Sequence, residues 1–241
     1  MNLLLDIMGR SDTWMHQGKY LFASGKYDES IKLLNRVIQK DPEDVEAWIF
    51  KGRVLYYQRK YMDALRCYEK AINYDPKNES AHSGIVQCCD KMIELDEKNI
   101  EVLDIKIGAL IILGKYENAL EICDSKPELN LKNAPRVWNW KGDVLRKQNK
   151  YEDAIKYYDV TLKQDPKNNE AWTNKGKALY LLGRASESAV CFDNALKVDP
   201  KNAKVWAMLG MALRATYKHV ESVEAFEKAK ELGYHDNMIN R

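Results

Sequence analysis

The sequence has no long hydrophobic run, and no stretch of its 241 residues approaches the ~20 apolar residues that cross a bilayer. An apolar cluster stands at residues 3–8, but Asp6 interrupts it and no basic residue precedes it. Because a secretory signal peptide needs a charged start and a longer apolar run, we expect neither a signal peptide nor a membrane partner. Hydrophobic residues make up 45% of the chain and charged residues 31%, which also excludes a disordered chain.

A strong net charge is also missing, since the formal value is only +2. Nucleic-acid-binding proteins gather positive charge because neutralising phosphate groups supplies most of their affinity. The near balance of charge therefore argues against a nucleic acid as the partner, while a local basic patch stays open.

Residues for metal or disulfide chemistry are few and poorly spaced. The five cysteines form no disulfide framework, and their odd number favours reduced thiols in a cytoplasmic protein. Cys88 and Cys89 are adjacent, which is not the spacing of a metal site. None of the four histidines stands four residues from another, as two metal ligands on one helix would.

Catalytic motifs are absent as well. The sequence has no glycine-rich phosphate loop and no strand to precede one. Cys67 and Cys191 each stand one residue before an aromatic side chain, at positions that pack helices together, so we expect buried thiols of low reactivity. The Asp and Glu residues fall mostly in turns or on surfaces. The sequence therefore predicts no catalytic residue, no metal, no cofactor and no enzymatic activity.

What the sequence does have is an internal repeat. Tryptophan, glycine and proline each recur with a step of 34 residues. The members are Trp14 and Trp48; Trp138, Trp172 and Trp206; Gly18 and Gly52; Gly142, Gly176 and Gly210; Pro42 and Pro76; Pro166 and Pro200. Three residue types that share one period indicate one structural unit used several times.

This pattern resembles the tetratricopeptide repeat, a helix–turn–helix unit of 34 residues. The closest stretch is residues 171–180, Ala-Trp-Thr-Asn-Lys-Gly-Lys-Ala-Leu-Tyr, and its repeat ends at Asp199-Pro200. The resemblance covers almost the whole chain. The expected organisation is an N-terminal segment 1–10, two repeats in 11–78, an abbreviated single-helix unit 79–99, an irregular repeat 100–134, three repeats in 135–236 and a tail 237–241.

The residues of one repeat also explain its fold. In the first helix, Trp172, Gly176 and Leu179 fall on one face, and the glycine lets a neighbouring helix approach closely. Gly183 suits a left-handed turn between the two helices, and Asp199-Pro200 stops the second. Because one helix pair cannot bury both faces, neighbouring pairs must stack. The resemblance thus implies an all-α fold, an α/α right-handed superhelix (solenoid) of stacked antiparallel helix pairs with a concave groove.

The middle of the chain departs from the pattern. The step from His82 to Leu103 is 21 residues, so about 13 residues of a 34-residue repeat are missing and one helix is expected in residues 79–99. Pro127 is expected to end the next helix near Ser125 and leave a loop as far as about Ala134. A hinge or a change of direction in the stack, and a rigid local repacking, remain open alternatives.

In the tetratricopeptide family, positions two, five, nine, twelve and thirteen of each first helix line the groove. We call the surface that these positions form the first-helix face. The resemblance implies that these positions, together with the clamp-like position six at Asn174, bind the ligand. The expected ligand-binding residues are Lys19, Arg53, Tyr56, Tyr57, Asp104, Arg136, Asn139, Asp143, Arg146, Asn174, Lys177, Tyr180, Lys204 and Arg214.

Charge is unevenly distributed along this face. The last three repeats place six basic residues on it against two acidic ones, while the earlier repeats are slightly acidic there. We therefore expect an acidic segment or a C-terminal carboxylate of a partner to bind at the last three repeats. A solvated charged face that binds nothing is the alternative. The carboxylate clamp of some family members is not expected, because Met208 stands where that clamp has Arg.

The predicted function is a protein–protein interaction scaffold or adaptor that binds a peptide or protein in the groove. An alternative is a self-assembling structural repeat protein that forms homo-oligomers through its exposed ends. A third class, base-by-base binding of single-stranded RNA by related helical repeats, is disfavoured. Such repeats carry a regular polar code, whereas the positions here include Met15, Ile49, Ile111 and Met211.

Overall fold

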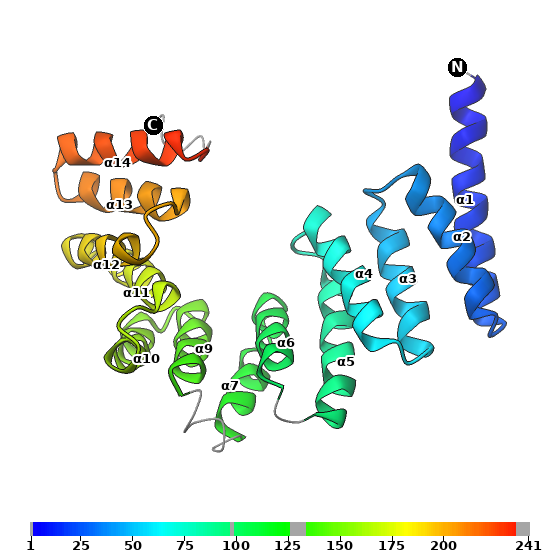
Figure 1. Ribbon diagram of the computed structural model, residues 1–241, viewed down its shortest axis with the longest axis horizontal. Coiled ribbons are helices and arrows are strands. Elements are labelled where there is room, and N and C mark those ends of the chain that lie inside the picture. The colour runs from blue at the N-terminus through cyan, green and yellow to red at the C-terminus, as the bar shows by residue number, and fades with distance from the viewer. Residues whose placement is uncertain (1, 97–98, 126–133, 235–241) are drawn as a thin grey trace. The chain divides into compact units, whose positions relative to one another are not determined.

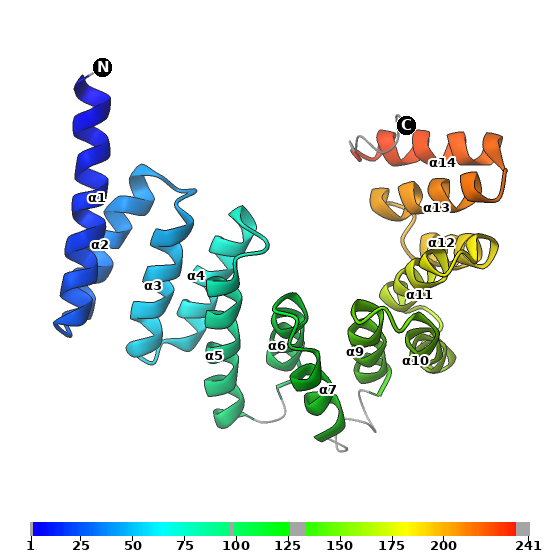
Figure 2. The ribbon, with the colours of Figure 1, turned by 180° about the vertical axis from the view of Figure 1, so that it is seen from behind.

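The computed structural model describes residues 2–96, 99–125 and 134–234. Every regular element in these ranges is an α-helix, and consecutive helices pack against one another within residues 2–112 and within residues 134–231 (Figures 1 and 2). The all-α architecture of stacked helix pairs is therefore confirmed. The chain forms two compact units, an N-terminal unit of residues 1–119 and a C-terminal unit of residues 120–241.

The N-terminal unit contains six complete helices, and the boundary between the units falls within a seventh. These helices are α1 (Asn2–Ala23), α2 (Tyr27–Lys40), α3 (Val45–Tyr57), α4 (Tyr61–Tyr74), α5 (Glu79–Leu95), α6 (Ile100–Ile112) and α7 (Tyr116–Ser125). Helix α1 continues from Asn2 into the first repeat, so the backbone of residues 2–10 begins that helix.

Three helix pairs make up the remainder of the described C-terminal unit. Their helices are α9 (Ala134–Lys147), α10 (Tyr151–Gln164), α11 (Asn169–Leu181), α12 (Ala185–Val198), α13 (Ala203–Ala215) and α14 (His219–Glu231). Helix α7 is described as far as Ser125, and Pro127 and the loop expected after it lie outside the described residues.

Local chemistry determines where the helices begin and turn. Asn168 caps α11 by accepting a hydrogen bond from the backbone N–H of Ala171, and Asp44 caps α3 in the same way. Gly183 adopts the left-handed conformation with φ of 76°, which confirms its predicted role in the turn. Tyr217 takes the same conformation with φ of 62° in the corresponding turn, so the turn does not require glycine.

The repeated glycines receive aromatic rings from the second helices. A Cβ atom added at Gly176 would lie 2.7 Å from the Phe192 ring, and one added at Gly142 would lie 2.6 Å from the Tyr158 ring. This contact confirms the close approach that the glycine spacing predicted. Between the same helices, the Ser188 hydroxyl donates a 2.8 Å hydrogen bond to the Gly176 carbonyl oxygen.

The short segment after the second repeat folds as the single helix α5. Helix α5 packs against α3, α4 and α6. Its Gly84 lies under the ring of Tyr68, where an added Cβ would come within 2.3 Å of the ring. Helix α5 therefore takes the place of a first helix beside α4 and presents its own side chains beside those of α3.

Candidate functional site

The first-helix face of the N-terminal unit contains two adjoining hollows. One has a volume of about 550 Å³ and the other about 610 Å³, and both are lined by Ile49, Arg53 and Ser80. The first is completed by Phe22, Tyr56, Tyr57, Tyr68, Glu79, Ser83, Gly84 and Gln87. We call it the aromatic hollow. Of the residues predicted from sequence, Arg53, Tyr56 and Tyr57 line this hollow and Lys19 lines the second.

Aromatic side chains form one wall of this hollow. The ring of Phe22 lies 5.2 Å from that of Tyr57 in an edge-on arrangement, and Tyr57 lies 5.9 Å from Tyr56. These centroid distances are in the range in which aromatic pairs stabilise one another. The wall is therefore an ordered cluster rather than a set of independent side chains.

The two cations on this face differ in their partners. Lys19 forms an ion pair of 2.5 Å with Glu46 and lies 5.8 Å from the centre of the Phe50 ring. The Arg53 guanidinium packs 5.6 Å from the same ring but forms an ion pair with no carboxylate of the described residues. The aromatic hollow thus contains an exposed arginine whose charge no described carboxylate neutralises at close range.

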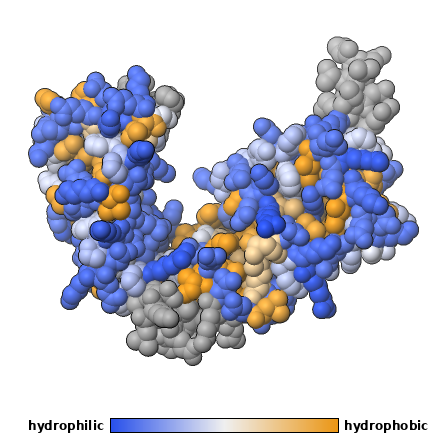
Figure 3. Space-filling view, in the orientation of Figure 1, coloured by the Kyte–Doolittle hydropathy of each residue, from blue (hydrophilic) through white to orange (hydrophobic). Residues whose placement is uncertain are grey.

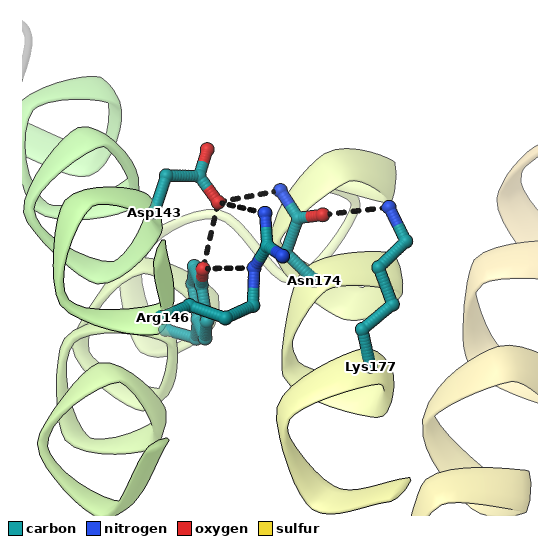
Figure 4. A network of polar contacts seen from close by, with 5 residues as sticks. Asp143, Arg146, Asn174 and Lys177 are labelled. Atoms are coloured by element: carbon teal, nitrogen blue, oxygen red, sulfur yellow. Dashed lines mark hydrogen bonds and ion pairs between the residues drawn. The ribbon is translucent and has the colours of Figure 1, made fainter. Parts of the chain in front are cut away.

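A different arrangement occupies the first-helix face of the C-terminal unit. Figure 4 shows Asp143 and Arg146 of α9 turned toward Asn174 and Lys177 of α11. Oδ1 of Asp143 accepts hydrogen bonds from the Tyr158 hydroxyl over 2.7 Å and from the Asn174 amide over 2.8 Å. The Arg146 guanidinium lies 3.5 Å from the same oxygen. We call these residues, with Lys177, the α9–α11 network.

Lys177 stands at the edge of this network. Its ammonium donates a 3.0 Å hydrogen bond to the Asn174 amide oxygen and forms an ion pair with no carboxylate of the described residues. Burial, followed by the nearby charges of Arg146 and Lys204, lowers the pKa of Lys177 to about 8, although the charges of Asp143 and Glu170 act in the opposite direction. The ammonium is therefore partly shielded from water, and the carboxylates near it form no ion pair with it among the described residues.

Three of the residues predicted to bind a ligand are mostly buried in or beside this network. Asp143 and Arg146 have side chains that are each only 15% exposed, and they are engaged with each other and with Tyr158. Asn139 is 2% exposed, and its amide oxygen is buried without a hydrogen-bond partner. Asn139 thus offers almost no surface to a partner, and Asp143 and Arg146 mainly support their neighbours.

The other predicted residues lie outside these two groups. Arg136 and Arg214 are exposed and pack over Trp140 and Phe226 on their own repeats. Tyr180 packs against the core formed by α12, α13 and α14, and Lys204 is exposed on α13. Asp104 is half-buried on α6 and belongs to neither group. The structure therefore brings only some of the predicted residues together in these two groups.

Sequence reasoning missed the polar wall of the aromatic hollow. Ser80, Ser83 and Gln87 of α5 line it. They occupy positions two, five and nine if the repeat count starts at Glu79 and His82 takes the place of Trp. Applying the same count to the abbreviated segment identifies these positions. Tyr158 was missed for another reason. It belongs to the second helix α10, and its hydroxyl reaches Asp143 only because α10 packs against α9.

In the described part of the chain, no group of three or more metal-ligating side chains is present and no helix is long and apolar enough to span a membrane. All five cysteines are buried, as predicted for Cys67 and Cys191, and burial raises the pKa of the Cys88 thiol to about 12. On the face shown in Figure 3, hydrophobic surface lies in small areas among hydrophilic ones.

Comparison with known proteins supports the pattern seen in the sequence. A family model described as tetratricopeptide repeat matches residues 21–83, and a second model of the same description matches residues 140–190. No curated protein gives a significant match to the chain.

Several solved structures match most of the chain at low sequence identity. A tetratricopeptide repeat protein from Parabacteroides merdae ATCC 43184 is 14% identical, with 96% of each chain covered and a TM-score of 0.55. YrrB, described as a TPR protein with an unusual peptide-binding site, is 18% identical over 86% of this chain and 94% of its own, with a TM-score of 0.48. MamA from Desulfovibrio magneticus RS-1 is 16% identical over 92% and 94%, with a TM-score of 0.40. At these identities, the similarity to the first structure supports the all-α repeat fold alone.

Proposed function

We propose that this chain, which is a tetratricopeptide-repeat protein, holds an extended acidic segment of a protein partner against the first helices of its repeats. The matches to tetratricopeptide repeats support the interpretation of this chain as a protein-interaction scaffold, and this fold is generally not catalytic. The acidic character of the partner and its place on the first-helix face are the specific parts of the proposal.

The observation that carries the proposal is the environment of Lys177. A half-buried ammonium group normally has a carboxylate beside it, because burying an unpaired charge is unfavourable. Lys177 has only an amide oxygen within hydrogen-bond distance among the described residues, and Arg146 and Lys204 add positive charge nearby. A carboxylate from a partner would supply the missing negative charge through a charge-assisted hydrogen bond.

The α9–α11 network supports this role by fixing the position of Lys177. Asn174 accepts from Lys177 and donates to Asp143, so the amide connects the lysine to a buried acceptor. Tyr158 and Arg146 hold Asp143 in turn. A preorganised cation binds an anion more tightly than a freely rotating one, because less side-chain entropy is lost on binding.

The test uses the full chain and a fluorescein-labelled peptide of ten glutamates, with fluorescence polarisation measured at low and moderate salt. Lys177→Gln is expected to weaken binding by about tenfold or more, the usual consequence of losing one charge-assisted hydrogen bond. Lys163→Gln is the matched control, because Lys163 is an exposed lysine on the second helix α10. Salt-sensitive binding that survives the combined change Lys177→Glu and Arg214→Glu would contradict the proposal.

Self-assembly is the second candidate, and exposed apolar side chains near the last described helix favour it. Val220 and Val223 of α14 are 70% and 56% exposed, and Tyr217 beside them is 85% exposed. Exposed apolar groups of this kind are typical of interfaces. Light scattering across protein concentration separates the candidates: a mass that rises with concentration and returns to the monomer value in Val220→Glu would support assembly through this end.

A further inference from the structure

The two walls of the aromatic hollow have different chemistry. Phe22 of α1 and Tyr56 and Tyr57 of α3 form the aromatic wall. Helix α5 contributes the polar side chains of Ser80, Ser83 and Gln87 to the lining. Hydroxyl and amide groups both donate and accept hydrogen bonds, so this wall suits the N–H and C=O groups of an extended backbone. The hollow therefore offers an apolar side for a partner's side chain and a polar side for its main chain.

The size and floor of the hollow favour a large side chain. Its volume of about 550 Å³ falls within the range of ligand pockets. The floor includes the buried ring of Tyr68 beside Gly84, where no side chain from α5 fills the space. Tyr57 remains 57% exposed although its ring packs edge-on against Phe22. An incoming aromatic ring has both an apolar floor and an exposed ring to contact.

Arg53 adds a charge requirement at the same place. Its guanidinium lines both hollows and has no ion-pair partner among the described carboxylates. Glu79 also lines the aromatic hollow, but it is exposed in the first turn of α5, where the helix dipole favours a negative charge. Arg53 is thus a cation of this hollow that forms no ion pair with a described carboxylate, and a partner's carboxylate can pair with it in a two-pronged geometry.

We infer that the aromatic hollow binds an aromatic side chain of an extended partner segment, and that an acidic residue next to it in that segment pairs with Arg53. This inference rests on the proposed function, since it specifies which partner side chains the N-terminal unit selects. It adds a site that is separate from Lys177, and either site can be tested without the other.

The experiment is a peptide array that displays every pair of adjacent residue types within a constant Gly-Ser flank, probed with the labelled full chain. The wild-type protein is expected to bind pairs of an acidic and an aromatic residue about tenfold more strongly than the average pair. Arg53→Glu is expected to remove the preference for the acidic residue and to create one for lysine. Tyr57→Ala is expected to remove the preference for the aromatic residue while the acidic preference remains.

Matched controls come from exposed residues elsewhere in the N-terminal unit. Arg36→Glu on α2 and Tyr74→Ala at the end of α4 change the same residue types away from the hollow and are expected to leave the array pattern unchanged. If Tyr57→Ala fails to fold, as judged by circular dichroism, the charge reversal by Arg53→Glu decides the matter alone, because Arg53 is exposed.

Two results would overturn the inference. One is an array without acidic–aromatic enrichment, including an array dominated by proline pairs. The other is an enrichment that persists unchanged in Arg53→Glu. Loss of oligoglutamate binding in Lys177→Gln, together with an array that Arg53→Glu does not alter, would leave the proposed function standing and remove the inference about the hollow.

Discussion

The indole Nε1 of Trp172 donates a 2.9 Å hydrogen bond to the carbonyl oxygen of Pro166, which follows the C-cap residue Asp165 of the preceding second helix α10. Trp206 makes the same bond to Pro200 over 2.8 Å. Where the tryptophan is replaced by His82, the ring Nε2 lies 3.0 Å from the Pro76 carbonyl oxygen. A direct contact therefore joins the aromatic ring of one repeat to the proline that follows the preceding helix at these boundaries.

Removing this bond is expected to weaken the boundary between two repeats. Trp172→Phe keeps most of the ring but loses the donor, so the free energy of unfolding should fall by about 0.5–1.5 kcal/mol, plus a contribution from the lost ring area. The midpoint of urea unfolding followed by circular dichroism measures the change. A midpoint equal to that of the wild type would show that the bond contributes nothing.

Two glycines give opposite predictions for the same substitution. Gly84→Ala would place a methyl group 2.3 Å from the Tyr68 ring, which lies in the core and cannot move freely, so a loss of about 1–3 kcal/mol is expected. Gly108→Ala meets nothing within 4 Å in the middle of α6 and should stabilise the helix by about 0.5–1 kcal/mol. Thermal unfolding of the pair checks both signs, and destabilisation by both would refute the packing argument.

The hydroxyl of Tyr158 should contribute more to stability than the hydroxyl of an exposed tyrosine. Tyr158→Phe removes a donor to Asp143 and leaves that carboxylate less well satisfied, so the expected loss is about 1–3 kcal/mol. Tyr151→Phe is the control, because its hydroxyl donates to Asn149 in an exposed position and should change stability little. Equal effects of the two changes would mean that the α9–α11 network does not stabilise the fold.

Oligoglutamate binding is expected to depend on pH through Lys177. The bound carboxylate needs the charged ammonium, whose pKa is about 8 in the free protein, so affinity should fall as the pH rises through 8. The pH dependence of free-protein stability has the opposite sign. The folded pKa lies below the unfolded value of about 10.4, so the unfolded state holds more protons between these values and stability rises with pH there. Fluorescence polarisation across pH 6–10 should show the alkaline loss in the wild type and not in Lys177→Gln.

Most of the fold could be predicted from the sequence because the residues that define a repeat act on their near neighbours in the chain. Gly183 in the turn and Asp199-Pro200 after the second helix act within a few residues of themselves, and the structure has them at the turn and helix end that the sequence predicted. The candidate site was harder to predict, because a position on the first-helix face does not reveal which side chains of the protein already contact the residue there. Asn139 and Lys177 were equivalent predictions, yet one is buried and the other stands at the edge of a network.

The sequence by itself determined that this protein is a stack of helix pairs, because a 34-residue period of tryptophan, glycine and proline specifies helices, turns and close contacts without long-range information. Only the tertiary structure decided which cations have partners. Packing brought Tyr158, Arg146 and Asn174 together around Asp143, whereas Arg53 and Lys177 were left without a carboxylate beside them among the described residues. The reason is physical: charge pairing here depends on distances between side chains of different helices, whereas sequence spacing fixes distances only within a single helix.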